Sequence, residues 1–387
     1  MKAQAVIGSN FGDEGKGLIT DYLVSKAEKP VVIRFNGGAQ AGHTVVLPDQ
    51  RHVFHHFGSG TFGQAPTFLS EFFVVNPLLY FRELDQLLAK NVRPVVVLDV
   101  RAALTTPFDM MINQTVEMAR GTARHGSCGV GINETITRNE RPEYRTIVAD
   151  LFDQNALRQK LMLIRDGYVK TRIHQLLGRD EIIPDLKHDV LIDNFLFFGK
   201  ELLNATFPVD NLSYMKRFKT FVFEGAQGLL LDEFHYWFPH VTRSRTGMVN
   251  VNKIAHELGL QKVDAYFATR SYLTRHGAGP LPFEAPGKIY DKIEDTTNIT
   301  NAYQGSLRFA PLNLDLLKES IARELTGSHI TPHLVITCLD QVSGTPQYVL
   351  NNQLIVKDDL TIQTSNLLPF KSVLGSYGPT RNDIRTL

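Results

Sequence analysis

The chain has 387 residues, of which 43% are hydrophobic and 21% charged, and its formal net charge is +1. This length can form one large domain or two, and the balanced charge gives no overall electrostatic reason to expect nucleic acid or an anionic membrane as a partner. The two cysteines, Cys128 and Cys338, are too few for a disulfide framework. Because no apolar stretch reaches transmembrane length and the N-terminus lacks a signal-peptide pattern, we expect a soluble protein of the cytoplasm.

The first predicted strand, residues 3–7, leads into a turn over residues 8–17 that contains four glycines, and a helical pattern follows. A glycine-rich turn between a strand and a helix presents backbone N–H groups to phosphate, and Lys16 can set a positive charge against phosphate oxygens. Asp13 and Glu14 repel an anion, so they favour a site that also holds a divalent metal or moves a proton. The alternative is a structural turn with acids near a helix N-terminus.

This turn matches neither of the two common phosphate-binding fingerprints. A Walker A loop requires a lysine followed by serine or threonine, whereas Lys16 is followed by Gly17, and Asn10 occupies the place of the first glycine. The glycines also miss the G-x-G-x-x-G spacing of the Rossmann turn. If the turn binds phosphate, it therefore belongs to a different class of phosphate-binding turn.

A second glycine-rich loop, residues 36–44, follows the β-branched run at 31–35. Two strands that each end in such a loop predict two loops at the same edge of an α/β sheet, which is where ligands bind in these sheets. His43 lies in the second loop between Gly42 and Thr44. A single loop histidine is more often a packing residue, but one that faces Asp13 is a candidate for proton transfer.

The middle of the chain is less informative. We expect a buried strand at 92–97, helices at 109–119, 150–164 and 191–203, and a glycine loop at 125–134 that is either a surface loop or a phosphate clamp. The arginine cluster 138, 141 and 145 is predicted to be a solvated face. His55 and His56 are interpreted as structural, and the histidines show no metal-ligand spacing.

The second half repeats the pattern of a strand followed by a glycine turn. The predicted strand 220–223 is followed by Glu224-Gly225-Ala226-Gln227-Gly228, and we expect 229–232 to continue it; Gln227 can both donate and accept, as recognition of a base edge requires. Residues 242–247 are a plausible phosphate seat. A further turn at 274–280 follows the expected strand 265–268, and another at 338–340 follows the expected strand 334–337. The last turn, at 375–381, lies near the C-terminus.

These features predict an α/β fold. We expect a large, mostly parallel central sheet flanked by helices, with glycine-rich loops at the carboxyl edge of the strands, formed by a single domain of residues 1–387 with smaller helical insertions. Several glycine turns at one edge suit a ligand with several anionic groups, such as a nucleoside triphosphate together with a second phosphorylated substrate. On pattern alone, the prediction is a nucleotide-dependent α/β enzyme.

Taken together, the motifs resemble the adenylosuccinate synthetase family. They occur in family order over nearly the whole chain, and the first two and the Glu-Gly-Ala-Gln-Gly motif are highly specific. The resemblance is carried by residues 11–17, 37–38 with 41–44, 223–228, 274–275 with 277–280, 339–340, and 378–379 with Arg381.

The resemblance implies a ligase that joins L-aspartate to C6 of a 6-oxopurine nucleotide at the expense of a nucleoside triphosphate. Asp13 would take the proton from N1, O6 would attack the γ-phosphate to give a 6-phosphoryl intermediate, and the amine of aspartate would then displace phosphate. His43 would act as general acid, and Lys16 and Gln227 would contact the phosphates and O6. Mg²⁺ would be held by Asp13 and the carbonyl of Gly42.

The resemblance also implies the remaining site residues. The substrate nucleotide would contact Asn10, Gln40, Ser127, Cys128, Arg141, Gln227, Thr242, Arg275 and Gly277. The triphosphate would contact Gly12, Glu14, Gly15, Lys16, Gly17, Gly42, His43, Thr44, Asp340, Ser376, Gly378 and Pro379. Aspartate would contact Thr297 and Arg308. The resemblance also implies a homodimer in which each subunit contributes an arginine across the interface to its partner. Arg141 is the nearest match to that arginine.

The departures from the family pattern resemble its viral branch, which converts dGMP to a 2-aminoadenylosuccinate nucleotide so that phage DNA can carry 2-aminoadenine. Gln40 replaces an asparagine, Ser127 and Cys128 replace a threonine pair, and Phe11 replaces a tryptophan, so the changes surround the purine. The hypothesis is therefore dGMP as substrate, in the host cytoplasm, with ATP or dATP as co-substrate. The alternative is an ordinary family member that uses IMP and GTP, for which Asp340 is suited through the N1 and N2 donors of guanine.

Two other classes compete with these. The first is a nucleotide-binding homologue without turnover, against which the intact Asp13, Lys16 and His43 argue. The second is a P-loop switch that hydrolyses GTP, against which the missing Walker lysine-hydroxyl pair argues.

Overall fold

The computed structural model describes residues 1–121, 127–181, 189–294, 306–327 and 329–387. Within them the strands are β1 Lys2–Gly8, β2 Pro30–Arg34, β3 His43–Val46, β4 Arg51–Phe54, β5 Thr67–Leu69, β6 Val74–Val75, β7 Val96–Asp99, β8 Ala103–Leu104, β9 Phe207–Val209, β10 Thr220–Glu224, β11 Val263–Arg270, β12 Tyr272–Arg275, β13 Arg308–Asn313, β14 Ile330–Thr337, β15 Gln347–Leu350, β16 Gln353–Val356, β17 Ser372–Ser376 and β18 Ile384–Thr386. The helices are α1 Lys16–Ser25, α2 Pro77–Leu88, α3 Pro107–Arg120, α4 Ile132–Asn139, α5 Gln154–Leu163, α6 Val169–Leu177, α7 Val190–Ala205, α8 Met248–Glu257, α9 Leu314–Glu324 and α10 Leu360–Ser365.

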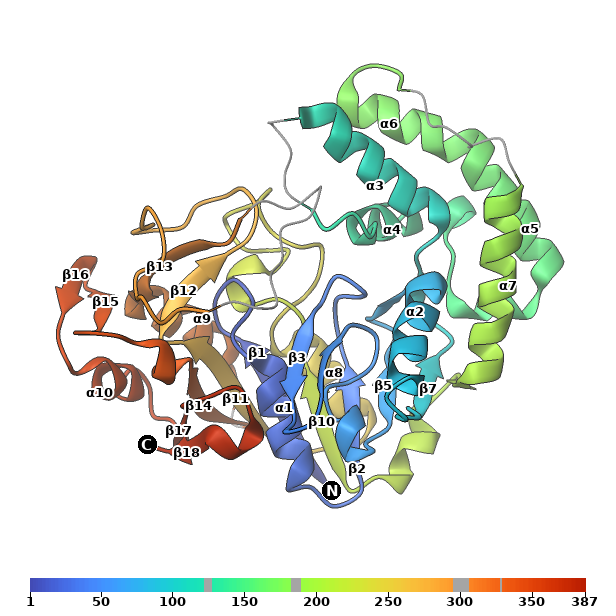
Figure 1. The fold of residues 1–387 in the computed structure, drawn as a ribbon. Coiled ribbons are helices and arrows are strands. Elements are labelled where there is room, and N and C mark those ends of the chain that lie inside the picture. Colours follow the sequence, from blue (N-terminus) through green and yellow to red (C-terminus); the bar gives the residue numbers. More distant parts are fainter. Residues whose placement is uncertain (122–126, 182–188, 295–305, 328) are drawn as a thin grey trace.

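A large sheet organises the fold, as the sequence predicted (Figure 1). Within the described residues, ten strands form it in the order β18-β17-β14-β11-β1-β10-β2-β5-β7-β9, and every pair is parallel except β17 with β18. Its central strands are apolar and buried almost throughout, as expected for a parallel sheet that is covered on both faces.

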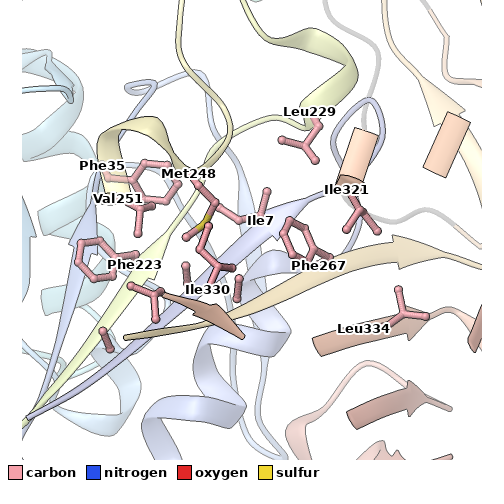
Figure 2. Close-up of a cluster of buried hydrophobic side chains, with 14 of the residues drawn as sticks. Ile7, Phe35, Phe223, Leu229, Met248, Val251, Phe267, Ile321, Ile330 and Leu334 are labelled. Atoms are coloured by element: carbon pink, nitrogen blue, oxygen red, sulfur yellow. The ribbon is translucent and has the colours of Figure 1, made fainter. Parts of the chain in front are cut away.

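Alternate side chains of β1 face opposite layers of the protein. Ala5 and Ile7 belong to a hydrophobic cluster with α8 and α9, whereas Val6 belongs to another cluster with α1. Figure 2 shows the first cluster, in which Ile7 lies close to Met248 of α8. Because side chains alternate along the strand, β1 is buried on both faces, and this packing holds the turn that follows it against α1.

The helices α3 to α7 gather at one end of the molecule (Figure 1). They enclose a separate hydrophobic cluster and lie in the chain between β8 and β9. Smaller sheets are formed by β12-β13-β15-β16, β3-β4 and β6-β8. None of the helices in the described ranges combines the length and the apolar character needed to cross a bilayer.

Three local predictions need correction. The segment 229–232 does not continue β10, because Leu229–Leu231 forms a 3₁₀ turn in which the N–H of Leu231 bonds to the carbonyl of Gly228. The strand expected at 92–97 begins later, as β7, and the turn at 274–280 follows β12 of a small sheet rather than the central β11. The helix at 109–119 is confirmed as α3, with a capping box at its N-terminus.

The prediction that Arg138 lies on a solvated face is wrong. Its side chain is 0% exposed. The guanidinium makes two hydrogen bonds to Asp109, at 2.8 Å and 2.9 Å, and others to the carbonyl of Leu104 and the hydroxyl of Thr146. The residue therefore joins α3, α4 and the strand β8 from inside the helical cluster.

We expect Arg138→Met to lower the free energy of unfolding by about 3–5 kcal/mol, because it leaves the buried carboxylate of Asp109 without its counter-charge. Chemical denaturation measures this change, and Arg145→Met, at an exposed position, is the matched control. Equal stability of the two variants would show that Asp109 finds other partners.

Glu83 is a second buried charge in this part of the fold. Its carboxylate accepts the backbone N–H groups of His55 and His56 at 2.8 Å and 2.7 Å, and the rings of His52 and His56 lie 3.6 Å away. Burial raises the pKa of Glu83, but the hydrogen bonds and charges of the histidines outweigh burial and lower the pKa to about 2. His55 and His56 thus have the structural role that the sequence predicted.

Because the pKa of Glu83 is lower in the folded state, its ionisation adds stability above the unfolded pKa of about 4.5, and this stability is lost as the pH falls through 2. We expect Glu83→Gln to cost about 3 kcal/mol at pH 7. The difference from the parent protein should shrink between pH 4.5 and pH 2 in urea unfolding series. A difference that stays constant over this range would exclude the ionised carboxylate as its cause.

Candidate functional site

The carboxyl ends of β1, β2 and β10 meet at one edge of the sheet. These strands are in register, with Val6 beside Glu224 and Glu224 beside Arg34. The turns that follow the three strands line a cavity of about 540 Å³. The structure therefore brings together the predicted residues Gly12, Asp13, Gly15, Lys16, Gly17, Gln40, Gly42, His43, Thr44, Cys128 and Gln227.

The first turn is shaped by left-handed backbone conformations and by Glu14. Gly12, Asp13 and Gly15 have φ angles of 94°, 63° and 82°. Glu14 is 1% exposed and points inward. Its carboxylate accepts the N–H groups of Asn10 and Gly12, at 3.0 Å and 2.8 Å, and pairs with Lys16 at 2.6 Å. Glu14 thus braces the turn from beneath rather than lining the cavity.

Asp13 is held at the cavity by two basic residues. Its Oδ2 lies 3.1 Å from Nε2 of His276, and Nε of Arg270 donates to its backbone carbonyl. Burial raises the pKa of Asp13, but the hydrogen bond from His276 and the charges of Arg270, His276 and Lys16 outweigh burial and lower the pKa to about 2. The carboxylate is therefore ionised at neutral pH and chemically able to accept a proton or bind a cation.

His43 is oriented by a fully buried carboxylate. Its Nδ1 lies 2.8 Å from Oε1 of Glu224, and Glu224 also accepts hydrogen bonds from the backbone and hydroxyl of Ser59. Burial lowers the pKa of His43, and the charge of Glu224 opposes that shift. A ring that donates from Nδ1 to Glu224 presents Nε2 to the cavity, and Nε2 can donate to a ligand there only when the ring is protonated.

A second cavity of about 540 Å³ adjoins the first. The two share Gln40, Cys128, Leu231 and His276, so they form one cleft with a common junction. Their sizes fall within the range of about 300–1,000 Å³ that small-molecule sites occupy. The second chamber includes the predicted Ser127, Thr242, Arg275 and Gly277.

Several basic side chains of the second chamber escaped the sequence analysis. Arg172 pairs with Glu134 at 2.7 Å, and Arg120 lies 3.5 Å from Glu117. The chamber also contains His240, together with Arg243 from the phosphate seat that the sequence predicted. Such a lining suits an anionic group, and these residues come from helices and loops whose proximity in the fold a single sequence does not reveal.

Other predicted site residues lie outside the two cavities. Asn10 donates to Thr269 at 2.8 Å behind the first turn, and the guanidinium of Arg141 lies over the ring of Tyr168. Arg308 pairs with Glu284 and donates to two backbone carbonyls, so binding a substrate carboxylate would require it to exchange Glu284.

The residues predicted to contact the base of the triphosphate lie further along the same edge of the sheet. Asp340 follows β14, and Ser376, Gly378 and Pro379 stand at or beyond the end of β17. These two strands are parallel neighbours, so their ends meet. Thr297 lies outside the described residues.

Arg270, His276 and Glu224 are the main residues of the site to which sequence reasoning gave no role. His276 stands inside a glycine turn and Glu224 begins the Glu-Gly-Ala-Gln-Gly motif, so both lay within patterns that the sequence singled out. Their partners are distant in the chain, and for that reason their function was not apparent.

A protein-family model described as adenylosuccinate synthetase matches residues 5–377. The adenylosuccinate synthetase of Borrelia turicatae is 30% identical, over 99% of this chain and 84% of that protein. That of Clostridium perfringens is 32% identical, over 92% of this chain and 83% of that protein.

Two solved structures share the fold. The fully ligated adenylosuccinate synthetase from Plasmodium falciparum matches with a TM-score of 0.78 at 19% identity, over 100% of both chains. The cyanophage S-2L succinoaminodeoxyadenylate synthetase (PurZ), solved with dGMP and with dATP as an energy donor, matches with a TM-score of 0.66 at 17% identity, over 100% of this chain and 95% of that one.

We expect Lys16→Met to weaken binding of tripolyphosphate with Mg²⁺ by about 10- to 100-fold, because it removes a charge-assisted contact from the first turn. Isothermal titration calorimetry measures this affinity. Lys26→Met, which removes an exposed lysine from the same helix region, should bind like the parent. An unchanged affinity of the Lys16 variant would mean that the anion binds elsewhere.

Proposed function

The chain belongs to the adenylosuccinate synthetase family, whose members are ligases that form a C–N bond at the expense of a nucleoside triphosphate, and we propose that its substrate is dGMP. The product would be the 2-aminoadenylosuccinate nucleotide. The alternative is IMP with GTP, and the curated relatives that the chain matches are adenylosuccinate synthetases. The observation that carries the ligase chemistry is the shared cavity of Asp13, His43 and Gln227.

The ionised Asp13 suits the first step. It takes the proton from N1 of the purine, and the electron pair moves to O6. Gln227 holds O6 through its amide N–H, and O6 attacks the γ-phosphorus as the bond to the leaving diphosphate breaks. Asp13 is a carboxylate before the purine arrives, and its catalytic value as a base comes from its position at the cavity rather than from its lowered pKa.

His43 and Lys16 act on the transferring phosphoryl group. Lys16 contacts phosphate oxygens, and His43, held by Glu224, donates a hydrogen bond to the developing charge. An anion beside the ring stabilises the imidazolium and opposes the lowering of the pKa of His43 by burial. The amine of aspartate then attacks C6, the C6–O bond breaks, and inorganic phosphate leaves. Positioning and charge stabilisation provide most of the rate in such transfers.

The donor set fits Mg²⁺. Asp13 supplies a carboxylate and Gly42 a backbone carbonyl, both at the cavity. The described residues contain no group of three or more acidic, histidine or cysteine ligands, which suits an ion that is held by one or two carboxylates together with substrate phosphates. When bound, Mg²⁺ would neutralise charge on the triphosphate oxygens.

The preference for dGMP is supported by the residues around the junction. Gln40 and Cys128, which depart from the family pattern, both line the first cavity. The PurZ structure, which shares the fold, holds dGMP with dATP, so ATP or dATP is the co-substrate that we propose. A buried 2-amino group requires an acceptor, and its absence costs about 1–3 kcal/mol.

We also propose that the active form is a homodimer to which Arg141 contributes. Its guanidinium rests on Tyr168 at 5.5 Å and stays partly exposed, so it can meet a partner subunit. Aspartate would be bound by Arg308 together with Thr297.

The assay that tests the function supplies aspartate, Mg²⁺ and ATP, dATP or GTP with dGMP, GMP or IMP, and follows phosphate release and the purine product. We expect turnover of dGMP, and Asp13→Asn should reduce it by at least about 10³-fold, because no base remains for N1. Efficient turnover of IMP with none of dGMP contradicts the substrate. Full activity of Asp13→Asn contradicts the mechanism, and triphosphate hydrolysis without purine or aspartate would indicate a different enzyme class.

A further inference from the structure

Two glutamine side chains at the site carry buried polar atoms that have no hydrogen-bond partner within the described residues. They are both amide atoms of Gln40 and Oε1 of Gln227. Gln40 lines both chambers and Gln227 lines the first. Buried amides in folded proteins are nearly always hydrogen-bonded, and each unpaired group costs about 1–3 kcal/mol. The pair therefore points to a polar ligand at the junction.

The two amides lie beside the same residue, Gly37. A methyl group added to Gly37 would lie 3.3 Å from Oε1 of Gln227 and 3.4 Å from Nε2 of Gln40, and only 2.6 Å from the side chain of Ala226. Gly37 has a φ of 73°. The absence of a side chain at position 37 thus leaves room for the two amides beside each other.

Matching donors with acceptors distinguishes guanine from hypoxanthine. With N1 assigned to Asp13 and O6 to the amide N–H of Gln227, the unpaired atoms still include two amide oxygens, which are acceptors. Guanine offers two further N–H donors, on the exocyclic amine at C2. Hypoxanthine has only a C–H at that position, so it would leave the oxygen of Gln40 buried and unpaired.

The other residues at the junction are poor partners for an amine. Leu231 has no polar side-chain atom, and Cys128 has only a weakly accepting sulfur. His276 bonds to the carboxylate of Asp13 through Nε2, and when the ring is protonated as the partner of that carboxylate it has no acceptor nitrogen. Among the residues at the junction, Gln40 has an amide oxygen that can accept a hydrogen bond from the amine.

We propose that Gln40 is the specificity-determining residue of this site and that its amide oxygen receives the exocyclic amine at C2 of a guanine nucleotide. This inference rests on the proposed function. It adds that the choice between guanine and hypoxanthine nucleotides is made by one side chain outside the proton-transfer machinery.

The test compares dGMP with dIMP, which differ only in the 2-amino group. We measure kcat and KM for the full chain and for Gln40→Met, which keeps the length of the side chain and removes its polar atoms. The parent should favour dGMP by about 10-fold or more, and Gln40→Met should lose about 10- to 100-fold in kcat/KM for dGMP, mostly through KM, with less than about a threefold change for dIMP.

Two further variants separate recognition from folding. Gln40→Glu keeps the length and an acceptor oxygen, so it should retain the preference for dGMP even if Gln40→Met is poorly folded. Gln261→Met changes an exposed glutamine and should behave like the parent. Thermal melting of each variant checks that the fold is intact.

The contradicting outcomes are distinct. A parent protein that uses dIMP and not dGMP removes both the guanine substrate and the role of Gln40. A parent that prefers dGMP, combined with equal losses for both nucleotides in Gln40→Met or loss of the preference in Gln40→Glu, removes the role of Gln40 and leaves the proposed substrate standing.

Discussion

The parallel register of β1, β2 and β10 is the constraint on which the site depends. Parallel neighbours end at the same edge of a sheet, and here the residue Glu224 is aligned with Val6 on one side and Arg34 on the other. Three glycine-rich turns that are far apart in the chain therefore open into one cavity. The chemistry resides in these turns, and the strands serve to align them.

Two carboxylates beneath this edge fix the positions of two basic side chains. Glu14 pairs with Lys16 and Glu224 with His43, and both acids are buried. Isolated buried charges are costly, but each of these accepts several hydrogen bonds that offset the loss of water. The lysine and the imidazole are thereby held before any substrate arrives, which lowers the entropy lost when the reactants are aligned. Asp13 differs because it reaches the cavity.

The sequence predicted much of this arrangement because strands followed by glycine turns are local patterns. The mostly parallel sheet and the meeting of Asp13, His43 and Gln227 at one edge follow from such patterns. The inward direction of Glu14 could not be predicted, since a carboxylate in a glycine turn can face a ligand or the backbone beneath it.

The charged pairs in the helical cluster could not be predicted from the sequence either. Arg138 stands in a run of arginines that is typical of a solvated surface, yet its partner Asp109 lies on another helix. The pairing of His276 with Asp13 likewise joins positions that are distant in the chain. Such pairs depend on tertiary packing, which neither the composition nor the periodicity of the sequence reveals.

Catalysis and selectivity are separable in this site on chemical grounds. In the proposed mechanism Asp13, His43 and Gln227 act on N1, O6 and the phosphoryl group, and every 6-oxopurine nucleotide presents these in the same way. Discrimination must therefore come from atoms that the substrates do not share, which are those at C2 and on the sugar. In the proposal made above, an unpaired buried amide at the junction would provide about 1–3 kcal/mol of discrimination at C2, or about 5- to 150-fold, without any change in the groups that carry out the reaction. A family with one reaction can in this way serve different purines through a single residue of the second loop.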